Sequence, residues 1–97
     1  MDTIATLRAK QGKVEVEGDV VALGPVREFA KFGKSGRVAN ATLQDASGKI
    51  LLTLWNDEID KVKVGARVRV LNGYVSEWQG EKQLTAGRFG SLEVVPA

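Results

Sequence analysis

Residues 50–62 have the sequence ILLTLWNDEIDKV, which changes within a few positions from a strand pattern to a helix pattern. Side chains alternate between two faces along a strand, so Ile50, Leu52 and Leu54 share one face. This face is the more apolar of the two, and we assign it to the core. Trp55 then points outward, at the end of the strand and directly before the helix.

The second half of this stretch, residues 56–62, predicts a capped helix of one or two turns that stops before Gly65. Its acids lie early and its lysines late, as the helix dipole favours. The dipole also accounts for Asp57, Glu58 and Asp60 at the start of the helix. We therefore expect no metal ion there.

Short alternating runs separated by glycines indicate a chain made mainly of strands. Besides the strand at 50–56, we expect strands over residues 14 to about 29, 38–44, 67–75 and 82–86. The first of these is long for a single strand, and we expect a bend at Gly18 or Gly24. Residues 91–95 are expected to pair back onto the sheet.

Three connections between these strands have recognisable turn or loop sequences. Residues 45–48 predict a hairpin turn, in which Asp45 bonds to its own backbone and Gly48 supplies a positive φ. Residues 31–37 predict a loop with two glycines and three cations. Residues 77–81 predict a second loop with an aromatic side chain at its base.

This order of elements, with a short helix between the third and fourth strands, predicts an all-β OB-fold, which is a five-stranded Greek-key barrel. The alternatives are another small barrel, such as an SH3-like barrel, or a fragment of a β-sandwich. The long first strand and the position of the helix favour the OB-fold. We expect one domain over residues 1–97, with its core at about 14–95 and a polar lead-in at 1–13.

The 97 residues include no cysteine and no histidine, which excludes disulfides, thiol nucleophiles, imidazole bases and the usual zinc ligands. We therefore expect a non-catalytic protein without a cofactor. No apolar run approaches the about 18 residues of a membrane span, so we expect a cytoplasmic protein associated with the nucleoid and not with a membrane. The net charge is only +2, so a local basic patch is needed to hold any anionic partner.

Three of the six aromatic residues, Trp55, Tyr74 and Trp78, are surplus to an interior filled by aliphatic side chains. A lone tryptophan on a strand often only caps the edge of a core. Bases, however, stack on aromatic faces for about 1 to 3 kcal/mol each, which suits sequence-tolerant binding of single strands. The side of Tyr74 stays open, because Gly73 interrupts the strand pattern. We assign the remaining aromatic residues to packing at the barrel ends, namely Phe29, Phe32 and Phe89.

The loop at 31–37 carries three cations and no acid, and its glycines allow the backbone to approach phosphates closely. We expect phosphate contacts from Lys31, Lys34 and Arg37, and Phe32 is a possible further contact to a bound strand. Other candidates for phosphate or polar contacts are Thr53, Lys82, Gln83, Thr85 and Arg88. The alternative for any single lysine is an ordinary solvated side chain.

Four motifs resemble the archaeal single-stranded-DNA-binding proteins that have a simple OB domain. They are Thr53–Asp57, Val64–Gly65, Asn72–Gly80 and Leu84–Arg88, and the similarity runs from about residue 14 to residue 95. That family is also similar to the OB domains of archaeal replication protein A and to the human single-strand DNA sensors. The resemblance implies that Trp55, Tyr74 and Trp78 occupy base-stacking positions. Some relatives have another aromatic residue where this chain has Thr85.

We therefore expect largely sequence-independent binding of single-stranded DNA, in replication, recombination or repair. One alternative is an RNA-binding or tRNA-binding OB module of the translation apparatus, which uses the same physics. The other alternative is a protein-interaction OB domain, with the outward aromatic residues as hot spots. The resemblance also implies repair or replication proteins as partners, recruited through a flexible tail that this sequence does not contain.

Overall fold

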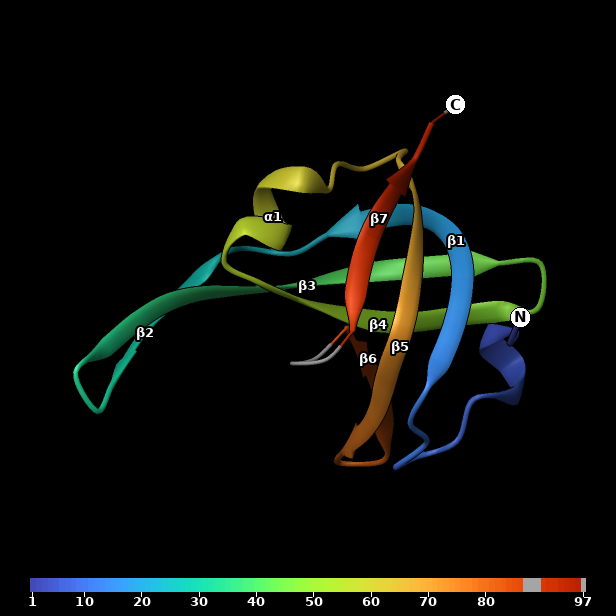
Figure 1. Cartoon of the computed structure of the whole chain (residues 1–97), viewed down its shortest axis with the longest axis horizontal. Coiled ribbons are helices and arrows are strands. Elements are labelled where there is room, and N and C mark those ends of the chain that lie inside the picture. Colours follow the sequence, from blue (N-terminus) through green and yellow to red (C-terminus); the bar gives the residue numbers. More distant parts are fainter. Residues whose placement is uncertain (87–89, 97) are drawn as a thin grey trace.

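A computed structural model describes residues 1–86 and 90–96, and Figure 1 shows that strands dominate it. The strands are β1 (Val14–Leu23), β2 (Arg27–Lys31), β3 (Lys34–Asp45), β4 (Gly48–Trp55), β5 (Arg67–Trp78), β6 (Glu81–Thr85) and β7 (Ser91–Val95). A 3-10 turn, η1 (Ile4–Thr6), precedes them, and a short helix, α1 (Asp57–Lys61), lies between β4 and β5. Within the described ranges, no helix has the length and apolar character needed to cross a membrane.

Five of the strands close into a ring in the order β1, β3, β4, β6, β5 and back to β1. The β4–β6 pair is parallel, and the other pairs of the ring are antiparallel. β7 pairs antiparallel with β5 outside the ring, which confirms the expectation for residues 91–95. The strand order and the helix position match the predicted OB arrangement.

The first strand curves strongly so that it can pair with two neighbours (Figure 1). It pairs with β5 from Val14 to Asp19 and with β3 from Asp19 to Leu23. The change of partner occurs next to Gly18, one of the two glycines expected at a bend. A Cβ at Gly18 would lie only 2.6 Å from the carbonyl oxygen of Gln44, so this close crossing needs a glycine.

The interior of the ring is apolar, and its buried residues come from the expected strand faces. Leu52 and Leu54 of β4 and Leu84 of β6 are fully buried, and Ile50 is nearly so, as the alternation predicts. Among the described residues, no polar or charged residue is buried. The core is therefore filled by aliphatic side chains, and the aromatic residues are left for the surface.

The N-terminal segment is more than the polar lead-in that we expected. Ile4 and Leu7 are buried in the same core as the ring strands. The N–H of Ile4 donates to the Asp45 carboxylate at 2.9 Å, and the Lys82 ammonium donates to the Leu7 carbonyl at 2.8 Å. Ile4 and Leu7 lie in a short, mostly polar run that has no sustained periodicity, so the sequence pattern did not reveal this packing.

Residues 14–31 form two strands and not one. β1 ends at Leu23, and β2 forms a separate hairpin with the first part of β3. The stretch 31–37 is therefore not a loop, because only Phe32 and Gly33 form the turn between the two strands. Figure 1 shows that this hairpin, which we call the β2–β3 arm (residues 27–38), projects from the ring.

Two further turns differ in detail from the expectation. Asp45 accepts hydrogen bonds from the backbone N–H groups of Ser47 and Gly48, as predicted, but Gly48 has no positive φ. At residues 77–81, the two strands continue through Trp78 and Glu81, and the turn consists only of the residues between them, which both have positive φ. Trp78 is thus held at the end of a strand.

An extra residue in β5 decides the direction of Tyr74. Val14 of β1 pairs with Gly73, whereas Val16 pairs with Val70, so β5 has one residue more than β1 in this interval. Asn72 takes a positive φ of 53° there, as in a β-bulge. The bulge shifts the alternation by one position, so that Gly73 faces the core and Tyr74 faces outward.

Candidate nucleic-acid interface

The outward face of β3, β4, β6 and β5 presents rows of polar and aromatic side chains that run across the strands. One row joins Asn40, Thr53, Thr85 and Tyr74, which are neighbours in the strand registers. Trp55 lies beside Val38 at the end of β4, and Gln83 lies one row beyond Thr85. We refer to this surface as the outward face.

Three aromatic residues that the sequence marked as surplus are exposed on this face or at its edge. The exposed fractions are 43% for Trp55, 44% for Tyr74 and 66% for Trp78. Both indoles line an open groove of about 730 Å³, whereas Tyr74 lies outside it. The groove is lined by Arg27, Glu28, Phe29, Val38, Asn40, Leu51, Thr53, Trp55, Trp78, Glu81 and Gln83.

Phe29 belongs to this surface and not to the end of the barrel, so its expected packing role was wrong. Its ring meets the indole of Trp55 edge-on, with the ring centroids 5.8 Å apart and the planes at 83°. Gly36 lies opposite Phe29 in the β2–β3 arm, and a Cβ there would lie 2.6 Å from the Phe29 ring. Phe32 does not pack at the barrel end either, because it is 92% exposed at the tip of the arm.

Cations lie on the same side of the arm as Phe29. Side chains alternate along each strand, and Arg27, Phe29 and Lys31 share one face of β2. In the register of the arm, Arg27 lies opposite Val38 and Lys31 lies opposite Lys34. Since Val38 belongs to the outward face, all three cations continue that face beyond Trp55.

Arg37 lies on the other face of the arm, where it holds the helix. Its guanidinium contacts the Asp60 carboxylate at 2.9 and 3.4 Å, and its backbone N–H donates to the Asn56 side chain at 3.0 Å. The side-chain hydrogen bond between Arg37 and Asp60 raises the pKa of Arg37 and lowers the pKa of Asp60. The side-chain oxygen of Asn56 is thus used by the arm, and Asn56 makes no side-chain cap on α1.

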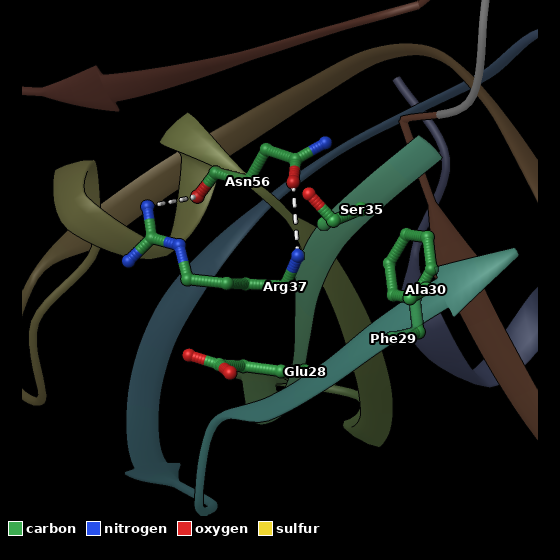
Figure 2. Close-up of a pocket in the computed structure, with 7 residues that line it drawn as sticks. Glu28, Phe29, Ala30, Ser35, Arg37 and Asn56 are labelled. Atoms are coloured by element: carbon green, nitrogen blue, oxygen red, sulfur yellow. Dashed lines mark hydrogen bonds between the residues drawn. The ribbon is translucent and has the colours of Figure 1, made fainter. Parts of the chain in front are cut away.

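Figure 2 shows the open pocket between this side of the arm and the start of α1, and its lining includes Arg37 and Asn56. Glu28 lies opposite Arg37 in the register and adds a negative charge beside it. The setting of Arg37 is therefore acidic on two sides, from Glu28 and from Asp60. A phosphate contact from Arg37 stays a prediction, and it would compete with the ion pair.

The remaining predicted polar residues are spread over the outward face. The Thr53 hydroxyl donates to the Asn40 side chain at 3.3 Å, and Gln83 and Thr85 are half-buried beside it on β6. Lys82 is turned toward the N-terminal segment, where it holds the Leu7 carbonyl. Arg88 and Phe89 lie outside the described residues. In the described ranges, no group of three acidic side chains is placed to hold a metal ion.

Sequence reasoning missed Arg27, Phe29 and Asn40 as members of this surface. The alternation Arg-Glu-Phe-Ala-Lys over residues 27–31 carries the signal, since it places two cations and a ring on one face. That signal is readable only once these residues are recognised as a strand of their own.

A curved ring of five strands, with a short helix between β4 and β5 and exposed aromatic residues on one face, defines an OB-fold of the kind that binds oligonucleotides or oligosaccharides. The family model of the OB-fold nucleic acid binding domain matches residues 14–92, and the chain belongs to this family.

Two relatives with known names match most of the chain. The chain is 32% identical over 77 residues to replication factor A of Methanothermobacter thermautotrophicus, covering 78% of this chain and 10% of that protein. It is 24% identical over 86 residues to the single-stranded DNA binding protein Ssb of Saccharolobus solfataricus, covering 89% of this chain and 58% of that protein. The chain therefore spans only part of either relative.

A solved structure agrees with both the fold and the sequence relationship. The second OB-fold domain of replication protein A from Methanococcus maripaludis superimposes with a TM-score of 0.81 at 26% identity, covering 99% of this chain and 95% of that one. The predicted OB-fold and the resemblance to archaeal single-strand-binding proteins and replication protein A domains are thus confirmed.

Proposed function

We propose that this domain binds single-stranded DNA without strong sequence preference and without catalysis, in DNA replication, recombination or repair. The observation that carries the proposal is the exposure of Trp55, Tyr74 and Trp78 on the outward face. Bases would stack on these three rings, and Phe29 would support the first of them. Arg27, Lys31 and Lys34 would hold the phosphates of the strand as it continues onto the arm.

Packing alone does not explain these aromatic residues. The core of the ring is complete with aliphatic side chains, and each of the three rings leaves more than two fifths of its surface in water. A base has two apolar faces and gains about 1 to 3 kcal/mol by stacking on such a ring. The bases of a duplex are already stacked on each other, so a row of exposed rings favours single strands.

The names of the relatives support the same proposal. One relative is called a single-stranded DNA binding protein and another a replication factor. The polar side chains between the rings are amide and hydroxyl groups, which can donate to or accept from any base. The surface therefore suits binding that tolerates many sequences.

The proposal is tested by fluorescence anisotropy with labelled oligonucleotides. The probes are oligo-dT of about 20 nucleotides, which exceeds the roughly 4 to 16 nucleotides that one OB-fold covers, the matched RNA and a matched duplex. We expect saturable binding of oligo-dT and much weaker binding of the duplex. Tighter binding of the RNA would indicate an RNA-binding module instead, and no binding of any probe would favour a protein-interaction domain.

A further inference from the structure

The tip of the β2–β3 arm carries a residue that its backbone does not favour. Phe32 and Gly33 form a two-residue turn with φ values of 52° and 76°. Two positive φ values are the mark of a type I′ turn, which favours asparagine or aspartate followed by glycine. A bulky aromatic residue with positive φ is uncommon. The turn itself therefore gives no reason for a phenylalanine at this position.

Packing gives no reason either. The Phe32 side chain is 92% exposed, more than any other large apolar side chain in the described residues. The Lys31 ammonium lies 5.7 Å from the centre of the ring. A large ring held in water at the end of a two-stranded arm becomes buried only when something else covers it.

The position of Phe32 relative to the outward face suggests what covers it. Val38 is the register partner of Trp55, and Lys34 lies four residues before it along β3. At about 3.3 Å per residue, the tip of the arm therefore lies about 13 Å beyond Trp55. Figure 1 shows the arm reaching away from the ring in this direction. A strand that leaves the Trp55 platform along the arm passes the paired lysines and then meets the Phe32 ring.

We infer that Phe32 is a wedge that opens duplex DNA where it joins a single strand. The inference rests on the proposed function, since the single-stranded part must lie on the outward face. The ring would enter the terminal base step, and Lys31 and Lys34 would hold the phosphates of the two parting strands. Insertion of an apolar side chain between base pairs unstacks them, which is a known way for proteins to deform a duplex.

The charge around the ring favours nucleic acid as the occupant. Residues 29–37 contain three cations, Lys31, Lys34 and Arg37, and no acid. The two lysines next to the ring lie directly opposite each other in the register. A ring between two cations suits a base step that is flanked by phosphates.

The test uses a duplex with a single-stranded oligo-dT tail and 2-aminopurine at the first base pair, whose fluorescence rises when that pair opens. Phe32→Asn is the informative variant, because asparagine suits the turn and keeps the arm folded. Val64→Asn is the control, because it replaces another exposed apolar residue, which lies between α1 and β5. All proteins are compared at concentrations that saturate the single-stranded tail. Any capture of ends that open spontaneously is then the same for every variant.

We expect Phe32→Asn to bind oligo-dT within about twofold of the unsubstituted protein and to lower the opening equilibrium on the order of tenfold, as for the loss of one stacking contact. Phe32→Trp should retain opening, and Val64→Asn should behave like the unsubstituted protein. Opening by Phe32→Asn at the original level would overturn the inference. An equal loss of oligo-dT affinity would also overturn it, since Phe32 would then be an ordinary stacking platform.

Failure of the unsubstituted protein to bind oligo-dT at all is a separate outcome. It would contradict the proposed function itself, and therefore also the inference that Phe32 is a wedge. Binding of oligo-dT without any opening of the junction would leave the proposed function intact and contradict only the wedge.

Discussion

The ring of Phe29 stands edge-on to the indole of Trp55, with the centroids 5.8 Å apart and the planes at 83°. The two residues come from different hairpins, since Phe29 is in β2 and Trp55 ends β4. The contact joins the β2–β3 arm to the ring at the place where we propose that the strand passes from one to the other. We therefore expect the orientation of the Trp55 indole to depend on Phe29.

The first prediction concerns this pair. We expect Trp55→Ala and Phe29→Ala each to weaken oligo-dT binding, Trp55→Ala by about 1 to 3 kcal/mol. The double variant should lose less than the sum, with a coupling of about 0.5 to 1.5 kcal/mol, because each ring positions the other. Anisotropy titrations of the four proteins measure this cycle.

Stability provides the control for that cycle. Phe29 is 37% exposed, so Phe29→Ala should lower the free energy of unfolding by less than about 1 kcal/mol, against about 3 to 5 kcal/mol for a fully buried phenylalanine. A large loss of stability with unchanged affinity would show that Phe29 belongs to the core after all.

The second prediction concerns the glycine beneath the Phe29 ring. A Cβ at Gly36 would lie 2.6 Å from Phe29 and 2.8 Å from the Asn56 side-chain oxygen, so Gly36→Ala forces the ring or the arm to move. We expect weaker oligo-dT binding with the ring of strands intact. Gly12→Ala is the matched control, because nothing lies within 4 Å of a Cβ there. Equal affinities of the two variants would contradict a positioning role for Gly36.

Those parts of the fold that follow from alternation were predictable from sequence. Ile50, Leu52 and Leu54 face the core because β4 is regular and one of its faces is plainly apolar. The β2–β3 arm was not predictable in this way, because residues 34–37 are two cations, a serine and a glycine with weak strand preference. They form a strand because β2 pairs with them, which is a hairpin contact and not a local property.

The residues of the candidate site likewise differ in whether the local sequence pattern determines their direction. Trp55 was placed correctly because its strand has no irregularity before it, whereas the direction of Tyr74 depends on the bulge at Asn72. Arg37 looked like one of three equivalent loop cations. Its ion pair with Asp60 joins residues 23 positions apart, and only the folded chain shows that it lies on the opposite face from the two lysines.

The third prediction uses this separation of the cations. About two to four phosphate contacts give a slope of log K against log salt of roughly −1.5 to −3, at about −0.7 per contact. We expect Lys34→Gln to reduce the slope by about 0.7 for every DNA sequence alike. Arg37→Gln should change it less, because its guanidinium already has a carboxylate partner. Titrations at several salt concentrations distinguish the two.

Two results of the salt titrations would contradict the third prediction. A larger effect of Arg37→Gln than of Lys34→Gln would mean that the strand displaces Asp60 and crosses the other face of the arm. A slope near −6 for the unsubstituted protein would mean that charge and not stacking holds the DNA.

The fourth prediction concerns acid. Hydrogen bonds from Arg67 and Arg69 lower the pKa of Glu17 below its usual 4.5, so the folded state holds this proton less tightly than the unfolded state. The stabilisation is therefore complete above the unfolded pKa and is lost as the pH falls through the lowered pKa of the folded state. We expect Glu17→Gln to lower the melting temperature near neutral pH and to reduce its fall from about pH 6 to about pH 2.

Glu77→Gln is the control for the acid experiment, since it removes the same charge from β5 away from the two arginines. Circular dichroism melts at a series of pH values give the comparison. Parallel melting curves for Glu17→Gln and the unsubstituted protein would show that the Glu17 network does not contribute to stability.

Titration of the intrinsic tryptophan fluorescence with oligo-dT tests the central claim most directly, because both tryptophans of the chain lie in the proposed groove. Stacking of a base changes the surroundings of an indole at once. We expect saturable quenching, with a part of it lost in Trp55→Phe and the rest lost in Trp78→Phe. Unchanged emission at a concentration where anisotropy shows the oligonucleotide fully bound would place the DNA away from both indoles and contradict stacking on this face.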